Sequence, residues 1–385
     1  MKIPLVLILV LWCFNVAPLR AQERQVYMNW HYNNAEKDKV FEAWKQYLTQ
    51  KDQTDTLWCM ADRNKYKGVD LLKDGLGLNG SLYNISFDCN VLTISELGDH
   101  FLVRTALYWY EKDTLVGNKM VLFAIIDVLA KKQGNTYKFS NYIDYATAGW
   151  NKKTVGKIMY HYPPVYPFDI FKARAANRFI DSLEHWFGFT ADSIRYYIPL
   201  NCDDGHKMLG YEFYQVEGEQ TNLCGFYDSE NNIIYSNAAA GECYKHELIH
   251  QVNRLYPTAH SLLLAGVAAY IDDAGQRNKP EGFHIRRYLD YLKDHPADLN
   301  RFYEIRYIDE VTAPQYIFGA TICNALMRKG GLDLLKQAMT NTRQNEELVA
   351  FLKKNLQIKD FNTFFNREFD VYMHQEKALL RTTEN

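Results

Sequence analysis

The residues best suited to chemistry in this sequence are His246 and His250, with Glu247 directly after the first histidine. On an α-helix, residues four apart lie on one face, with Cβ atoms about 5–6 Å apart. Two imidazoles at that separation can share one Zn²⁺ at about 2.1 Å each. A glutamate beside the first histidine can act as general base on a water at the metal. The His-Glu-x-x-His spacing therefore predicts a zinc site with ligands His246 and His250 and catalytic residue Glu247.

The segment that follows the histidines extends this prediction. It reads Leu-Leu-Ala-Gly-Val-Ala-Ala-Tyr over residues 263–270. Together the two segments resemble the peptidase-MA-like gluzincins, relatives of the thermolysin and aminopeptidase lineage. In that family a second helix carries Glu-Gly-x-Ala-x-Tyr, and Gly266, Ala268 and Tyr270 match it. The resemblance covers about residues 170 to 345 and implies a zincin-like metallopeptidase domain.

The sequence departs from the family at Ala265, which stands where the glutamate would supply the third zinc ligand. A methyl group cannot bind zinc, and a catalytic zinc normally has three protein ligands and a water. His260 and Asp272 are the nearby residues that could replace it. The same resemblance makes Tyr316 a candidate for stabilising the oxyanion, while packing is the alternative role for this tyrosine.

Two functions from different classes follow. The first is an exported zinc-dependent peptidase that hydrolyses peptide bonds, with a peptide or protein as substrate. The second is a catalytically inactive pseudo-peptidase that serves as a binding or interaction module, as Ala265 suggests. A third possibility places the function in the N-terminal domain, which would bind a surface polymer with the peptidase-like part as its platform.

The elements that must position these residues fall into two groups, so the sequence predicts an α+β protein. Asn34 can cap a helix. Alternating runs at 81–87 and 101–109, a nearly all-apolar run at 120–129 and an aromatic-rich run at 136–145 predict a curved antiparallel sheet. In element order, residues 24–165 resemble nuclear-transport-factor-like or cystatin-like modules. The proline cluster at 163–167 predicts a boundary, with a mainly helical domain over residues 166–385.

In that second domain, Asp169 is expected to cap a helix that ends at Gly188. Short strands are expected at residues 193–200 and 232–236, and the resemblance implies that the second borders the cleft and pairs with an extended substrate. Further helices are predicted at residues 261–273, 281–292, 314–327, 346–356 and 360–373.

The composition indicates the cellular compartment of the protein and the kinds of partner it excludes. Residues 1–21 read as a secretory signal peptide, and no later stretch is apolar for long enough to span a membrane. The net charge of −2 and the lack of a run of Lys or Arg argue against a nucleic-acid partner. Six cysteines remain after the signal peptide, and Cys59–Cys89 and Cys202–Cys224 are the simplest disulfide pairs.

Overall fold

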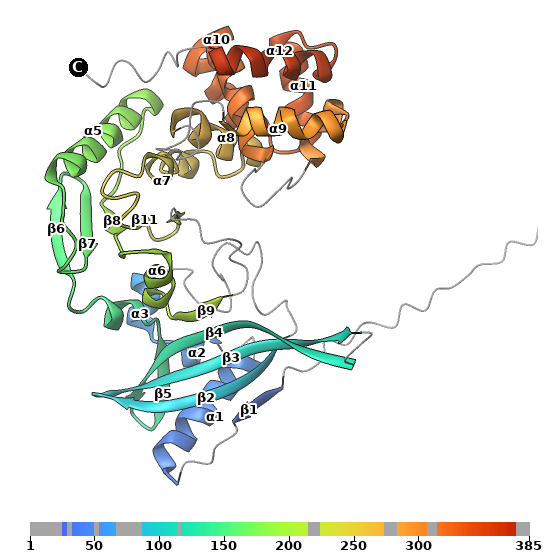
Figure 1. The fold of residues 1–385 in the computed structure, drawn as a ribbon. Helices are drawn as coiled ribbons and strands as arrows, with labels where there is room; N and C mark the ends of the chain where they lie inside the picture. The colour runs from blue at the N-terminus through green and yellow to red at the C-terminus, as the bar shows by residue number, and fades with distance from the viewer. Residues whose placement is uncertain are drawn as a thin grey trace, which may run out of the picture. The chain divides into compact units, whose positions relative to one another are not determined.

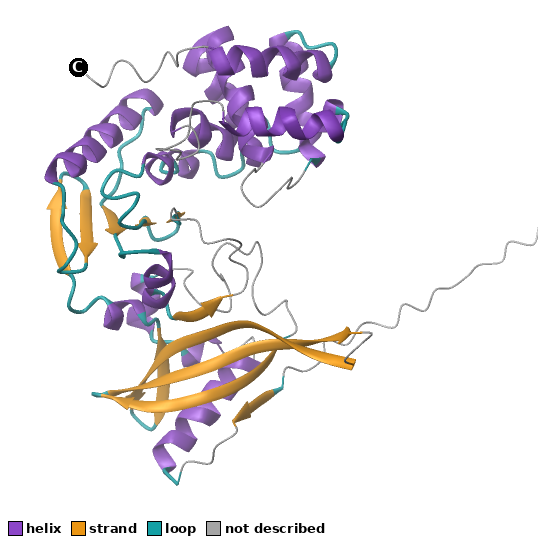
Figure 2. Ribbon diagram, viewed as in Figure 1, coloured by secondary structure: helices purple, strands orange, loops and turns teal. Residues whose placement is uncertain are grey.

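The computed structural model describes residues 25–28, 33–49, 54–66, 87–113, 117–214, 224–272, 283–305 and 314–374. The expected signal peptide lies outside these residues. The fold is α+β, with two sheets followed by a mainly helical C-terminal region (Figures 1 and 2). The chain divides into two compact units. The first is Met1–Met60 with Asp70–Ser140, and the second is Ala61–Val69 with Asn141–Asn385.

The first unit contains a twisted sheet of long strands with α1 (Ala35–Thr49). The strand order is β1-β2-β3-β4-β5, parallel between β1 and β2 and antiparallel elsewhere. The strands are β1 (Val26–Met28), β2 (Asp88–Leu97), β3 (His100–Asp113), β4 (Gly117–Gln133) and β5 (Thr136–Ser140). The short helix α2 (Thr54–Leu57) follows α1, and the next helix, α3 (Met60–Lys65), belongs to the second unit from Ala61 onward. The expected helix is present, and the runs expected at 101–109, 120–129 and 136–145 correspond to β3, β4 and β5. The strand expected at 81–87 lies outside the described residues except for Phe87, and β2 was not expected from the sequence.

Local chemistry explains where α1 begins and which face it buries. The side-chain oxygen of Asn34 accepts the backbone N–H groups of Glu36 and Lys37, at 3.0 and 3.2 Å. The apolar residues of one helical face are buried, and the indole N–H of Trp44 donates to the Thr105 hydroxyl at 2.8 Å. The indole therefore packs against the sheet without leaving a buried donor unsatisfied.

The second unit is built on a smaller sheet with the order β10-β11-β8-β7-β6. Its strands are β6 (Asn151–Val155), β7 (Ile158–Tyr162), β8 (Ile194–Tyr197), β10 (Phe226–Asp228) and β11 (Ile233–Tyr235), with α4 (Ile143–Ala146), α6 (Cys202–Met208) and β9 (Tyr211–Tyr214) beside them in sequence. The long helix α5 (Ile170–Phe187) shares a core with this sheet. As expected, Asp169 caps α5, and Gly188 ends it in the left-handed conformation at φ 70°.

The structure places the division of the chain earlier than the sequence pattern does. The boundary expected near residue 165 falls inside the second unit, because β7 pairs with β8 and its residues Ile158 and Tyr160 lie in the same core as α5. The proline cluster forms a turn, with the Tyr166 N–H donating to the Pro163 carbonyl at 3.0 Å. Proline marks a change of direction equally well in a turn and in a linker.

Helices make up the rest of the second unit. They are α7 (Lys245–Ile249), a 3-10 helix (Val252–Leu255), α8 (Ser261–Asp272), α9 (Phe283–Asp294), a 3-10 segment (Leu299–Glu304), α10 (Pro314–Asn341), α11 (Asn345–Leu356) and α12 (Phe361–His374). The helices α8 and α10 approach at Gly266 and Gly319, where a Cβ added to Gly266 would lie 2.4 Å from the Gly319 carbonyl carbon. No helix among the described residues is long and apolar enough to cross a membrane.

One of the two suggested disulfides is present. Cys202 and Cys224 are bonded, with their Cα atoms 5.6 Å apart. Cys59 is a free thiol, so the suggested Cys59–Cys89 bond is not formed. Cys59 lies beside β5, since its N–H donates to Phe139, whereas Cys89 lies on β2 with β3 and β4 between. Cys59, beyond β5, is four strand spacings from β2, which amount to about 19 Å and are beyond the reach of a disulfide.

Candidate metal centre

The structure brings together the three residues that the sequence singled out on α7. His246, Glu247 and His250 each offer one ligand atom, and these atoms lie within 4.8 Å of one another. The two imidazole rings meet edge to face, with centroids 5.1 Å apart. His246 and Glu247 are buried, and His250 is partly buried. Two imidazole nitrogens and a carboxylate oxygen so close together are a donor set that can hold a divalent metal ion.

Burial keeps both imidazoles neutral at pH 7. It lowers the pKa of His246 to about 4. For His250, burial and then the neighbouring His246 lower the pKa to about 3, although the hydrogen bond to Asn253 acts in the opposite direction. Because a neutral imidazole keeps a nitrogen lone pair, each ring can serve as a metal ligand without first losing a proton.

Tyrosines of the sheet fix the segment that leads into α7. The Tyr196 hydroxyl donates to the Gly241 carbonyl at 2.7 Å and accepts the Tyr244 N–H at 3.1 Å. The Tyr160 hydroxyl donates to the Glu242 carbonyl at 3.0 Å. Gly241 itself has φ 67°, a conformation that favours glycine. The sheet thus sets the position at which α7 begins.

A buried asparagine fixes the chain just beyond the second histidine. The Gln251 side-chain amide donates to the Asn232 Oδ1 at 2.5 Å, and the Tyr227 hydroxyl donates to the same oxygen at 2.9 Å. The Asn232 amide in turn donates to the Ser193 carbonyl at 3.0 Å. Asn232 adopts φ 53° at the start of β11, a region that asparagine tolerates better than most residues. Both ends of the short α7 are therefore tied to the sheet.

Two further helices bring the other predicted residues to this region. α7 packs against α8, which carries Ala265, a partly buried residue. The Tyr316 ring, near the start of α10, meets the His246 ring edge to face with centroids 5.7 Å apart. Because α10 is in backbone contact with α8 at Gly266 and Gly319, both helices lie close to the histidine pair. Tyr316 thus lies beside the first histidine.

His260, one of the two substitutes considered for the third ligand, has both ring nitrogens engaged elsewhere. Its Nδ1 accepts the Leu262 N–H at 3.2 Å, which caps the start of α8. Its Nε2 is 2.9 Å from the Asn345 Oδ1 and donates to it. A histidine that binds metal would give up one of these contacts, so the structure assigns His260 to helix capping and packing. The side chain of Asp272, the other substitute, lies outside the described residues.

The strand expected to border the cleft does not have a free edge. The strand at residues 233–235, β11, pairs with β8 on one side and β10 on the other. The end of the sheet is β10, which also contacts α7. Pairing between strands distant in sequence decides which edge is open, so the pattern of residues 232–236 alone could not reveal it.

Sequence reasoning also missed Asn253. Its side-chain amide nitrogen lies 2.7 Å from the Nδ1 of His250. The available signal was the spacing, because a residue three positions after a histidine in a helical turn can reach its ring.

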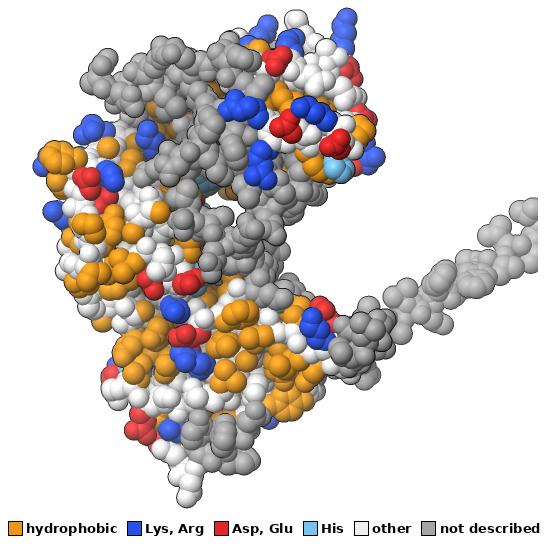
Figure 3. Space-filling view, in the orientation of Figure 1, with side chains coloured by type: hydrophobic (Ala, Val, Ile, Leu, Met, Phe, Trp, Pro, Cys, Tyr) orange, Lys and Arg blue, Asp and Glu red, His pale blue; other side chains and the backbone are white. Residues whose placement is uncertain are grey.

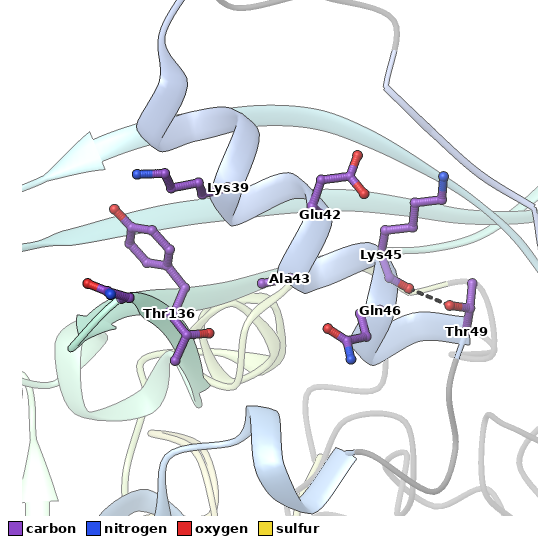
Figure 4. A pocket seen from close by; sticks show the side chains of 9 residues that line it. Lys39, Glu42, Ala43, Lys45, Gln46, Thr49 and Thr136 are labelled. Carbon is purple, nitrogen blue, oxygen red and sulfur yellow. Dashed lines mark hydrogen bonds between the residues drawn. The ribbon is translucent and has the colours of Figure 1, made fainter.

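The first unit offers two surfaces of a different kind. A pocket of about 500 Å³ lies between α1 and the β4–β5 hairpin, lined mainly by polar side chains including Lys39, Glu42 and Gln46 (Figure 4). Hydrophobic side chains also gather over the sheet of this unit on the face shown in Figure 3. Among the exposed apolar residues, Tyr110 and Met120 are cross-strand partners. Neither surface contains a set of groups like that on α7.

Comparison of the sequence with models of known protein families and with curated proteins finds no match.

Proposed function

We propose that this protein is an exported, zinc-dependent peptidase-like protein of the gluzincin type. The observation that carries the proposal is the set of ligand atoms from His246, Glu247 and His250, all within 4.8 Å of one another. The two histidines would hold Zn²⁺, which supplies Lewis acidity toward a water and a peptide carbonyl. Glu247 would take the proton of the attacking water as general base and pass it to the leaving amine.

The surroundings of the site support these roles. Both imidazoles stay neutral at pH 7 because burial lowers the pKa of His246 to about 4 and that of His250 to about 3. Glu247 is also buried, and a carboxylate is a more effective base where water is scarce. Tyr316, whose ring contacts His246, would donate its hydroxyl proton in a hydrogen bond to the developing oxyanion.

Export accounts for the disulfide between Cys202 and Cys224, since such bonds persist in oxidising compartments. The substrate or ligand would be a peptide or protein. We place the extended peptide along β10, which ends the sheet and contacts α7.

A second function is favoured by one specific observation. Ala265 offers no ligand, and His260 is engaged by Leu262 and Asn345. With only two histidine ligands, the metal would be held weakly. The protein would then act as a peptide-binding module without catalysis.

Zinc binding and peptide hydrolysis by the purified mature protein test both functions. We expect one zinc per chain by metal analysis, with binding lost in His250→Ala. Glu247→Gln should keep zinc and lower hydrolysis of a fluorogenic peptide library by about 100-fold or more, the usual contribution of a general base. Glu230→Gln, at an exposed residue, is the matched control and should leave hydrolysis unchanged.

The results separate the two functions. Zinc binding with hydrolysis supports the peptidase, and zinc binding without hydrolysis supports the binding module. Absence of zinc binding at micromolar free metal would contradict the peptidase.

A further inference from the structure

The orientation of the His250 ring depends on more than the helix that precedes it. α7 ends at Ile249, and His250 is its C-cap. The ring is held by Asn253, whose side-chain nitrogen lies 2.7 Å from Nδ1 and whose backbone N–H donates to the His250 carbonyl at 3.0 Å. The side-chain oxygen of Asn253 is buried and has no hydrogen-bond partner among the described residues. A buried amide satisfied at one end only is costly and calls for an explanation.

This contact determines which nitrogen of His250 carries the proton. An amide nitrogen is a donor only, so Nδ1 accepts, and the proton of the neutral ring must then lie on Nε2. Nδ1 is occupied by Asn253, which leaves Nε2 as the nitrogen available to a metal. In this tautomer Nε2 has no free lone pair, so the metal-free arrangement is not the one that binds. Metal-bound histidines instead donate their other N–H to an oxygen acceptor.

We propose that Asn253 is a positioning residue that sets the tautomer of His250, and that its amide turns over when a metal binds. This inference rests on the metal site of the proposed function. After the turn, Oδ1 accepts from a protonated Nδ1, and Nε2 is left with its lone pair toward the metal. One proton leaves Nε2 for solvent and one is taken up at Nδ1, so the charge of the ring does not change. The two ends of an amide have nearly the same shape, so the turn needs little repacking.

The proposed role matters because the metal has few protein ligands. With Ala265 in place of a third ligand, the orientation of each histidine accounts for a larger share of the affinity. Loss of such an oxygen acceptor typically weakens metal binding by about 10- to 100-fold. We expect the same range at Asn253.

Two variants test the inference by competitive titration with Zn²⁺ near neutral pH. Asn253→Asp keeps the shape and offers only acceptors, so it should bind zinc at least as tightly as the wild type. Asn253→Leu keeps the size without hydrogen bonds and should bind about 10- to 100-fold more weakly. Asn355→Leu, which removes an amide that donates to the Phe351 carbonyl in α11, is the matched control and should bind as the wild type does. Thermal unfolding in EDTA establishes that each variant is folded.

A spectroscopic readout separates positioning from packing. Long-range ¹H–¹⁵N spectra of protein labelled at histidine distinguish the two tautomers, and His250→Gln assigns the signal. We expect the Nε2–H form in the metal-free wild type, and the Nδ1–H form after zinc is added. The metal-free Asn253→Asp protein should already show the Nδ1–H form.

Three results would overturn the inference. They are wild-type affinity in Asn253→Leu, weak binding in both folded variants, and an Nδ1–H form in the metal-free wild type. If the wild type binds no zinc, the proposed function fails. The metal-free spectra of the wild type and Asn253→Asp then still show whether Asn253 determines the tautomer of the His250 ring.

Discussion

At the scale of single residues, the properties of the site depend on the neighbours of His246 and His250 as well as on the two histidines. Ala265 is on the helix that packs against α7, and Tyr316 contacts His246 from α10. His260 is used to cap α8 and to bind Asn345. A histidine close in sequence to a metal motif is therefore a poor guide to ligation, because its hydrogen bonds decide its role.

The first prediction concerns Ala265→Glu. If Ala265 replaces a metal ligand, a carboxylate at this position completes a set of three protein ligands. We expect zinc affinity to rise by about 100-fold in competitive titration, since even the loss of outer partners changes affinity by about 10- to 100-fold. Ser261→Glu, at an exposed position of the same helix, should leave affinity unchanged. Equal affinity of Ala265→Glu and the wild type would mean that position 265 does not face the metal.

The second prediction concerns His161, which stacks on Tyr197 at 4.5 Å and has no hydrogen-bond partner for either ring nitrogen among the described residues. Burial, and then the charges of Lys152 and Arg195, lower its pKa to about 4. Between about pH 6.5 and 4 the unfolded chain binds a proton that the folded chain does not, so stability falls as the pH falls.

His161→Phe keeps the stacking and removes this titration. Compared with the wild type, the variant should show a flatter fall of the free energy of unfolding from pH 6.5 to 4, by at most about 1.4 kcal/mol per pH unit. Urea denaturation at several pH values measures the two slopes. Identical slopes would show that His161 is protonated in the folded state as readily as in the unfolded state.

At the scale of elements, the site depends on how closely α8 and α10 approach. Gly266 and Gly319 are in backbone contact, and α8 also packs against α7, while Tyr316 of α10 contacts His246. Small residues at a crossing point allow helix axes to come closer than the usual spacing of about 8–10 Å.

The third prediction is that Gly266→Ala destabilises the protein. The new Cβ would lie 2.4 Å from the Gly319 carbonyl carbon, and a backbone atom cannot move aside without shifting α10. We expect a loss of about 1–3 kcal/mol in the free energy of unfolding, typical of overpacking. Gly149→Ala is the control, because a Cβ there meets no atom within 4 Å. A Gly266→Ala protein as stable as the control would contradict the close crossing.

At the scale of the whole molecule, the second unit is assembled from two separate stretches of the chain. Residues 61–69 belong to it together with residues 141–385. The Asp62 carboxylate accepts the Asn141 side-chain amide at 2.8 Å, and the Tyr66 hydroxyl donates to Asp144 at 2.6 Å. Arg195, on β8, donates to the Lys65 carbonyl at 2.7 Å.

The fourth prediction follows from this organisation. A fragment of residues 167–385 should not fold cooperatively, because it lacks β6 and β7 and with them core residues such as Ile158 and Tyr160. A fragment of residues 141–385 should fold, with lower stability than the full chain, because it lacks the contacts of residues 61–69. Circular dichroism during urea denaturation distinguishes these cases. Cooperative unfolding of the 167–385 fragment at the midpoint of the full chain would contradict a second unit that needs β6 and β7.

The sequence by itself determined the features that depend on neighbours along the chain. The helix caps at Asn34 and Asp169, the stop at Gly188, the long strands β3 and β4, and the closeness of His246, Glu247 and His250 all follow from spacings of four residues or fewer, or from local alternation. Such spacings fix geometry because a helix or strand has one repeat wherever it lies.

Only the tertiary structure decided the features that depend on partners far apart in sequence. These include the pairing of β7 with β8, the place of β10 at the end of the sheet, the separation of Cys59 from Cys89, and the engagement of His260 by Asn345. The contact between Asn253 and His250 also needed the turn that follows α7. Each results from competition among many possible long-range contacts, and packing of the whole core selects among them.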